Sequence, residues 1–261
     1  MPTFARWRHA VAVALVVAAM PCLGQGGRAA DPPAPTYAVV SLIGDEITVI
    51  QRRPQSIARI DTNQRDEIPV NDATFDRIAM TAAEAEIRRL KPRANVFQAA
   101  IRDKRLFALQ EGLLADTAES RDMRAAMQGL LTSNGATHLV LVAKRRSAAS
   151  FRIKDGTIGR GFLAGIGFYL DTVTRLHYDE SLQESPGFLA PFAYLSVSVL
   201  DAATLSTLKS ATAQESTMSL SIDSKEAVKA WDALTAEKKI EALAAVIRSG
   251  VSRATAAALA E

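Results

Sequence analysis

Cysteine and histidine are scarce in this chain. Cys22 is the only cysteine among 261 residues, and it follows an N-terminal apolar run that is typical of an export leader. Without that leader the chain has no disulfide, no thiol nucleophile and no cysteine-ligated metal. Two of the three histidines, His138 and His177, lie beyond the leader, and no His-x-x-x-His or His-Glu-x-x-His spacing occurs. We therefore expect no metal site and no cofactor.

Several catalytic and nucleotide-binding motifs are also missing. No Gly-x-Ser-x-Gly places a serine on a sharp turn. The run Gly159-x-Gly161-x-x-x-Gly165 has the wrong last spacing for a dinucleotide fingerprint, and no Gly-Lys-Ser or Gly-Lys-Thr completes a phosphate loop. We expect a protein that is not an enzyme. The alternative is a small-ligand binder or hydrolase that uses His138, His177 and Asp171.

The first 29 residues are predicted to be a secretory signal peptide. Arg6 and Arg8 precede an apolar run from Ala10 to Met20, and small residues follow. The apolar run is short for a bilayer span, which needs about 20 residues, so an uncleaved anchor is the lesser alternative. Pro21 stands where a lipobox has a small residue, so we expect a periplasmic protein without a lipid, with lipidation at Cys22 as the alternative.

Charge and length define the remaining chain. Arg6, Arg8 and Arg28 belong to the leader or its edge, which leaves 28 basic residues against 28 acidic ones. A neutral chain gives no reason to expect nucleic-acid binding. Residues 30–36 are predicted to be a proline-rich tether and residues 37–261 a single α/β domain with a C-terminal helix.

Periodicity predicts the elements of that domain. Strands 37–43 and 46–50 flank Gly44-Asp45, which favours a hairpin, and a polar loop follows to residue 70. A helix begins after Asn71 or Asp72 and stops at Pro92. The later elements are strand 95–101, helical region 104–134 with an interruption near 116–117, central strand 138–143, strands 192–200 and 205–214, short helix 224–233 and a helix capped by Thr235. This order predicts an α/β (α+β) fold: a mixed sheet with an antiparallel meander and helices on at least one face.

The stretch from Thr157 to Leu170 is the most unusual part of the chain. Read as one strand, it places Gly159, Gly161, Gly165 and Gly167 on one face and mostly apolar residues on the other. Bare backbone in a strand indicates close approach of another backbone, a ring or a ligand. We therefore expect close packing at Gly161, Gly165 and Gly167.

Aromatic residues gather around the same stretch. The set is Phe162, Phe168, Tyr169, Phe188, Phe192 and Tyr194. We expect them to form core between strands; an apolar surface for a partner or a membrane is the alternative. The candidate binding residues are Gly159, Gly161, Gly165, Gly167, Phe162, Phe168, Tyr169, His138 and His177. Lys144, Arg145 and Arg146 are read as a solvated sheet edge, with an acidic partner or lipid headgroup as the alternative.

The exported α/β layout, with Val197-x-Val199-x-Asp201-x-x-Thr204, resembles a group of bacterial envelope domains. These include the N-terminal domain of the Tol-system propeller protein, the curli-secretion channel lipoprotein and the lipoprotein activators of peptidoglycan synthases. The resemblance implies a non-enzymatic domain that works through protein contacts. We thus expect an envelope binding or assembly module whose partner is another envelope protein. A peripheral membrane contact and a membrane-associated oligomer stay open, and the oligomeric state is not specified.

Overall fold

The computed structural model describes residues 33–52, 63–101, 104–108, 110, 118, 120–153, 156–177, 184–217, 220–221, 231 and 234–260. Ala34–Glu261 forms one compact unit. The predicted signal peptide lies outside the described residues. Among those residues, no helix combines the length and apolar character needed to cross a membrane.

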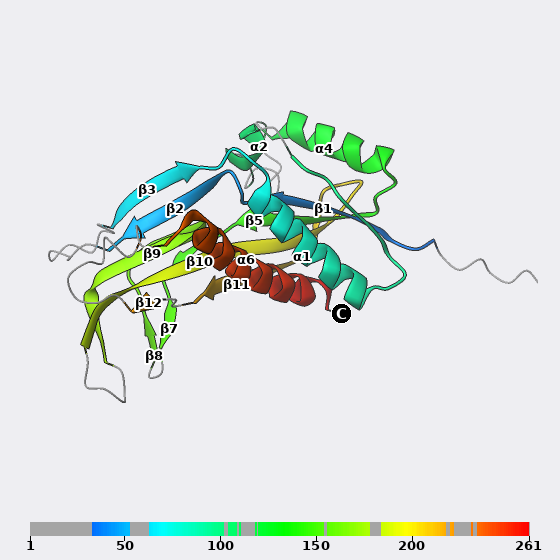
Figure 1. Ribbon diagram of the computed structural model, residues 1–261. Helices are drawn as coiled ribbons and strands as arrows, with labels where there is room; N and C mark the ends of the chain where they lie inside the picture. The colour runs from blue at the N-terminus through cyan, green and yellow to red at the C-terminus, as the bar shows by residue number, and fades with distance from the viewer. Residues whose placement is uncertain are drawn as a thin grey trace, which may run out of the picture. The chain divides into compact units, whose positions relative to one another are not determined.

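The unit contains helices and strands in mixed order (Figure 1). The helices are α1 (Thr74–Leu90), α2 (Lys104–Ala108), α4 (Arg121–Ser133) and α6 (Ala236–Leu259). The strands are β1 (Thr36–Leu42), β2 (Glu46–Gln51), β3 (Gln64–Pro69), β4 (Asn95–Gln98), β5 (His138–Lys144), β6 (Arg146–Ala148), β7 (Phe151–Ile153), β8 (Gly156–Ile158), β9 (Phe162–His177), β10 (Glu184–Asp201), β11 (Thr207–Ser216) and β12 (Leu220–Ser221).

Ten strands form one mixed sheet in the order β3-β2-β9-β10-β5-β1-β4, with β11, β12 and β6 attached at its sides. Strands β4, β1 and β5 are parallel, and β10 is antiparallel to β5, β9 and β11. The predicted fold class, a mixed sheet with an antiparallel meander, is confirmed.

Strand β10 runs through the whole sheet and changes partner in its middle. Its residues 184–194 pair with β9, and its residues 195–201 pair with β5. Each partner of β10 has a further parallel neighbour: β1 pairs with β5, and β2 pairs with β9. The sheet thus has a base, formed by β4, β1, β5 and the end of β10, and an extension, formed by β3, β2, β9 and the start of β10.

The hairpin predicted around Gly44-Asp45 is wrong. Strands β1 and β2 do not pair with each other. Strand β1 is parallel to β5, β2 is parallel to β9, and both β5 and β9 are antiparallel to β10, so the chain continues in one direction past Gly44. The true hairpin is β2 with β3, which pairs Glu46 with Pro69 and returns the chain to the start of α1. Local turn residues are compatible with both paths, and only the non-local partners decide between them.

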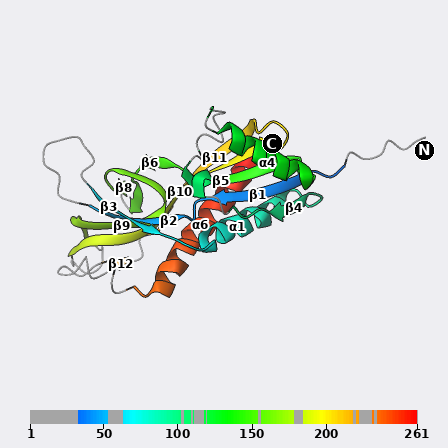
Figure 2. The ribbon, with the colours of Figure 1, turned by 90° about the horizontal axis from the view of Figure 1, so that it is seen from above.

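Apolar clusters cover both faces of the base. On one face, α1 and α6 pack on Val39, Val140 and Val197 in the main core. On the other, Phe107 of α2 and Met127 and Leu131 of α4 pack on the alternate residues of β1 and β5. Figure 2 shows α1 and α4 on opposite sides of β1. The prediction that 138–143 is a central strand covered on both faces is confirmed.

The helix predictions agree with the structure where it is described. Helix α1 has Asp72 Oδ1 accepting a hydrogen bond from Thr74 N at 2.8 Å, and Thr235 Oγ1 accepts from Lys238 N at the start of α6. The interruption expected at 116–117 and most of the short helix expected at 224–233 lie outside the described residues. Strand β3 replaces part of the loop expected over 52–70.

Candidate functional site

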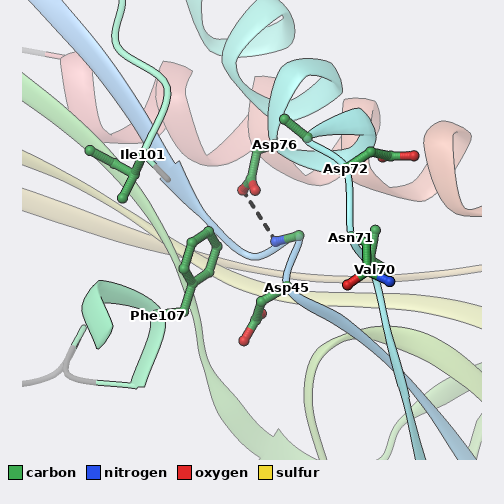
Figure 3. Close-up of a pocket in the computed structure, with 9 residues that line it drawn as sticks. Asp45, Val70, Asn71, Asp72, Asp76, Ile101 and Phe107 are labelled. Atoms are coloured by element: carbon green, nitrogen blue, oxygen red, sulfur yellow. Dashed lines mark hydrogen bonds between the residues drawn. The ribbon is translucent and has the colours of Figure 1, made fainter. Parts of the chain in front are cut away.

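A crevice lies at the carboxyl ends of the parallel strands β1, β4 and β5. In open α/β sheets this is the edge where ligands bind, because the chain leaves the strands there and loops line the opening. The crevice holds a cavity of about 290 Å³. Its apolar wall is Val70, Ala73, Ile101 and Phe107, and its polar wall is Gly44, Asp45, Asn71, Asp72 and Asp76. Figure 3 shows Phe107 and Ile101 on one side, with Asn71 and Asp72 on the other.

Asp76 joins the crevice to the sheet. Its Oδ1 accepts hydrogen bonds from Ser41 Oγ at 2.6 Å and Ile43 N at 3.0 Å. It also accepts one from Gly44 N at 3.1 Å, which Figure 3 shows as a dashed line. A Cβ on Gly44 would lie 2.6 Å from Asp76 Oδ2, so only glycine allows this approach. Burial raises the pKa of the Asp76 carboxyl, and the three donors offset that rise only in part. The bonds hold the end of β1 against the first turn of α1.

Asp45 and Glu46, which follow Gly44, bind Lys144 at the end of β5. Lys144 Nζ lies 2.7 Å from Asp45 Oδ1 and 2.7 Å from Glu46 Oε1. Burial alone would lower the pKa of Lys144, but its two carboxylate partners outweigh burial and raise the pKa above its ordinary value. Lys144 therefore stays charged and joins the end of β5 to the connection between β1 and β2, where base and extension meet.

Gly165 and Gly167 have the close neighbours that the glycine stripe predicts. A Cβ on Gly167 would lie 1.9 Å from Thr48 O and 2.8 Å from Phe192 Cζ. At Gly165, which has a φ of +67°, a Cβ would lie 3.1 Å from the Lys144 side chain. The bare backbone of β9 is thus covered by the chain itself.

The reading of 157–170 as one strand is wrong, because the chain turns between β8 and β9. Gly159 and Gly161 lie in that turn with φ values of 128° and 84°, outside both strands. Gly161 is half-buried. The four glycines therefore do not share one strand face, and two of them serve the turn.

The aromatic residues divide between the two sheet faces. Phe168 lies in the main core, where its ring is 5.0 Å from that of Trp231. Four others lie on the opposite face with Phe151: Tyr169, Phe188, Phe192 and Tyr194. These five are core, as predicted. Phe162 is 40% exposed.

The β7–β8 hairpin covers that second aromatic face. Phe151 is fully buried, with its ring centroid 4.7 Å from Tyr169 and 5.2 Å from Phe188. The hydroxyls of Tyr194 and Tyr169 bind the backbone on either side of this hairpin. Tyr194 Oη accepts from Ser150 N and donates to Ser150 O, and Tyr169 Oη does the same with Arg160. The aromatic residues therefore bind a segment of their own chain.

The structure does not bring His138, His177 and Asp171 together. His138 begins β5 and pairs with Asp201, whereas His177 ends β9 and pairs with Glu184, so roughly 55 Å of β10 separates the two histidines. His138 stacks on Tyr37 and its Nδ1 lies 2.8 Å from Thr137 Oγ1. Burial lowers the pKa of His138, and Asp201 opposes that shift.

Asp171 is committed to structural contacts. Its carboxylate is fully buried and forms an ion pair with Arg52 at 2.7 Å. It also accepts hydrogen bonds from Val173 N, Thr174 N and Thr174 Oγ1. The Asp201-x-x-Thr204 element is structural too, since Asp201 Oδ1 accepts from Ala203 N, Thr204 N and Thr204 Oγ1 and so closes the β10–β11 turn.

The crevice residues did not emerge from the sequence patterns. A signal was present in α1, where Asp76 falls on the same helical stripe as Ala79, Ala83 and Ile87, all buried. An acid on an apolar stripe indicates a buried, hydrogen-bonded carboxylate. Its partners at Ser41, Ile43 and Gly44 could not be found, since they belong to a turn that local signals assign to a hairpin.

Comparison with known proteins gave distant structural similarities. No family model matches the chain, and neither does any curated protein sequence. Among solved structures, the chain is similar to the PelC dodecamer from Paraburkholderia phytofirmans, with 12% identity over 88% of this chain and 90% of PelC and a TM-score of 0.36. It is also similar to lipoprotein GNA1162 from Neisseria meningitidis, with 10% identity over 77% and 94% of the two chains and a TM-score of 0.30. Protein XCC0632 from Xanthomonas campestris has 10% identity, covers 87% and 81%, and has a TM-score of 0.30. Because these TM-scores are low, the function is inferred from this chain's own geometry.

Proposed function

We propose that this protein is a non-catalytic binding module of the bacterial envelope, and that it holds a segment of a partner protein in the crevice at the carboxyl ends of β1, β4 and β5. The observation that carries the proposal is the cavity of about 290 Å³ between α1, α2 and the Gly44-Asp45 turn. The predicted signal peptide supports the envelope location.

The size and lining of the cavity favour a protein segment over a small molecule. Pockets for drug-sized ligands hold about 300–1,000 Å³, so this cavity is at the small end and fits one or two side chains. Phe107 and Ile101 offer apolar contact, while Asn71 and Asp72 are exposed and polar at the rim. An apolar floor with a polar rim is the anatomy of a protein-binding pocket.

The carboxylates of the crevice are occupied by structural roles. Asp76 holds the Gly44 turn, Asp72 holds Thr74 N, and Asp45 pairs with Lys144. A general acid or base needs a carboxyl group that reaches a substrate proton, and these groups already bind their own chain. This arrangement supports rigid binding as the role of the crevice.

Site-specific photocrosslinking in the native envelope tests the proposal. A photoreactive residue replaces Asn71 at the rim, and the same residue replaces Arg248, exposed on α6, as the control. We expect one discrete adduct from position 71 and none from position 248. No adduct from position 71, or equal labelling from both positions, contradicts binding at the crevice.

Two measurements on the purified protein test the non-catalytic part separately. Metal analysis and a panel of hydrolase substrates are expected to give neither stoichiometric metal nor turnover. If the protein turns over a substrate and the Asp76→Asn variant does not, the crevice is a catalytic site and the non-catalytic proposal is wrong.

A further inference from the structure

A second surface lies at the start of β9, in the extension of the sheet. The ring of Phe162 is partly exposed, and the guanidinium carbon of Arg146 lies 4.1 Å from its centroid. The side chain of Arg65 donates to Phe162 O from β3. Strands β6 and β9 pair Ala148 with Phe162, which places Arg146 beside the ring. We call Phe162, Arg65, Arg146 and Arg160 the Phe162 surface; Figure 2 shows β3, β6 and β8 at this end of the sheet.

The backbone under this surface is held by four hydrogen bonds. Arg160 N donates to Tyr169 Oη at 3.1 Å, and Tyr169 Oη donates to Arg160 O at 3.2 Å. Asn63 Nδ2 donates to Arg160 O at 2.9 Å, and Ala149 N donates to Gly161 O at 2.9 Å. Residues 160–162 are therefore preorganised, and a ligand would not need to order them.

Positive charge dominates the segments that meet here. Five exposed arginines belong to them: Arg65, Arg145, Arg146, Arg152 and Arg160. The described residues of the same segments, 63–69, 145–153 and 156–164, contain two acids, Asp66 and Glu67. Asp66 neighbours Arg65 in β3, so its side chain points to the opposite face of the strand, whereas Glu67 shares the face of Arg65. Because the chain beyond the leader is neutral as a whole, this excess is a local feature.

We propose that the Phe162 surface binds the phosphate headgroups of an anionic lipid bilayer. A guanidinium group matches phosphate oxygens through paired N–H donors, and an aromatic ring is favoured at the level of the headgroups. Arg65 of β3 and Arg146 of β6 contact Phe162, and Arg160 lies two residues before it in the β8–β9 turn. Laterally mobile headgroups adjust to each of these arginines. The contact is peripheral, and its strength depends on salt and on anionic lipid.

Vesicle cosedimentation tests this assignment. The purified protein is mixed with vesicles of phosphatidylcholine alone, or of equimolar phosphatidylcholine and phosphatidylglycerol. We expect binding to the anionic vesicles only, with loss at high salt. In the double variant Arg146→Gln, Arg160→Gln, binding is expected to fall by about thirtyfold, since each basic residue near an anionic surface contributes roughly a factor of five.

The matched control removes two exposed arginines from helices elsewhere, Arg121→Gln with Arg248→Gln. It has the same net charge as the test variant and is expected to bind like the unmodified protein. Phe162→Ala keeps every charge and is expected to weaken binding at low salt, without changing how steeply binding falls as salt is added. Circular dichroism checks that each variant is folded.

Four results would overturn the proposal. One is an equal loss of binding in the two double variants, which would reduce the effect to net charge. Another is equal binding to both kinds of vesicle. The third is binding of soluble polyglutamate, with the same dependence on Arg146 and Arg160, by a protein that ignores vesicles; that result would assign the surface to an acidic protein. Competition by free glycerol phosphate at millimolar concentration would likewise replace a bilayer with a soluble phosphate ligand.

Discussion

Gly167 shows how a single absent side chain permits two strands to pair. The backbone of β2 approaches so closely that a Cβ at this position would overlap Thr48 O, with the Phe192 ring at 2.8 Å on the same side. Backbone atoms of a central strand cannot move aside without breaking the β2–β9 pairing. The glycine is required by close approach, since its φ value is ordinary.

We therefore predict that Gly167→Ala strongly destabilises the fold. Overpacking a core costs about 1–3 kcal/mol, and overlap with backbone places this substitution at about 3 kcal/mol or more. Gly165→Ala is expected to cost less, because the added Cβ meets the Lys144 side chain at 3.1 Å and no backbone; its φ of +67° adds about 1–2 kcal/mol of left-handed strain. The control is Gly129→Ala in α4, which meets nothing within 4 Å and should stabilise the protein by about 0.5–1 kcal/mol. Urea unfolding measures all three, and equal stability for Gly167→Ala and Gly129→Ala would contradict the packing.

Asp76 makes stability depend on pH in a direction opposite to that of most carboxylates. Its pKa is raised by burial above the ordinary value of 3.8, so between 3.8 and its folded pKa the folded chain holds a proton that the unfolded chain has lost. Its contribution to stability is full below pH 3.8 and is lost as the pH rises through the folded pKa. Asn does not titrate but keeps an acceptor oxygen for Ser41 Oγ, Ile43 N and Gly44 N.

Asp76→Asn is accordingly expected to gain stability relative to the unmodified protein as the pH rises from 4 to 7. The neighbouring Asp72→Asn is the control with the opposite sign. Hydrogen bonds from Thr74 lower the pKa of Asp72, so its contribution is present above pH 3.8 and lost as the pH falls through the folded pKa. Urea unfolding from about pH 2 to pH 7 gives both differences, because Asp72 titrates below pH 3.8 and Asp76 above it; parallel pH profiles for the two variants would refute the burial argument for Asp76.

The β7–β8 hairpin depends on two tyrosine hydroxyls more than on its own length. Its strands have three residues each and pair only with each other, which is too little for a stable isolated hairpin. Phe151 anchors its middle in the aromatic core, and Tyr169 and Tyr194 bind the backbone at its two ends. The hairpin is stable because the sheet supplies these contacts.

Tyr169→Phe and Tyr194→Phe are each predicted to cost about 1–3 kcal/mol, because the first removes the tyrosine partner of Arg160 N and the second removes the tyrosine partner of Ser150 N and O. Hydrogen exchange of the β7–β8 amides should accelerate, while that of β1 and β5 changes less. Tyr37→Phe is the control, since among the described residues the Tyr37 hydroxyl has no hydrogen bond and its ring stacks on His138. Unchanged hairpin exchange in the double variant Tyr169→Phe, Tyr194→Phe would show that Phe151 alone holds the hairpin.

Elements with strong local signals were predictable, and their pairing was not. Helices α1 and α6 follow from helical periodicity and from polar residues at their starts: Asp72 accepts from Thr74 N just before the Ala73 cap of α1, and Thr235 caps α6. Strand β5 follows from an apolar run covered on both faces. Strand β3 was missed because Gln64–Pro69 is exposed and charged, and it is a strand only through pairing with β2. The crevice was missed for the same reason. Asp76 and Gly44 meet only because the chain continues from β1 into β2 in one direction, where local signals predict a hairpin.

The base and the extension share one core, although they have different strand partners. The main apolar cluster includes Val39 and Val140 of the base together with Phe168 and Leu189 of the extension. Strand β10 belongs to both halves, and Lys144 joins the end of β5 in the base to Glu46, the first residue of β2 in the extension. Because the two halves share a core and a continuous strand, unfolding of either half exposes the core of the other.

The two halves should therefore unfold together. We compare Leu141→Ala on β5 of the base with Leu189→Ala on β10 of the extension, both of which remove a buried leucine and are expected to cost about 2–5 kcal/mol. Native-state hydrogen exchange then follows the slowest amides of β1 and β5 and those of β9 and β10. Each variant should lower the protection of both sets by the same free energy, equal to its loss of global stability, because no path opens one half while keeping the shared core. If Leu189→Ala lowers protection in β9 and β10 alone, the extension is a separate cooperative unit, and β10 is a hinge between two units instead of the strand that unites them.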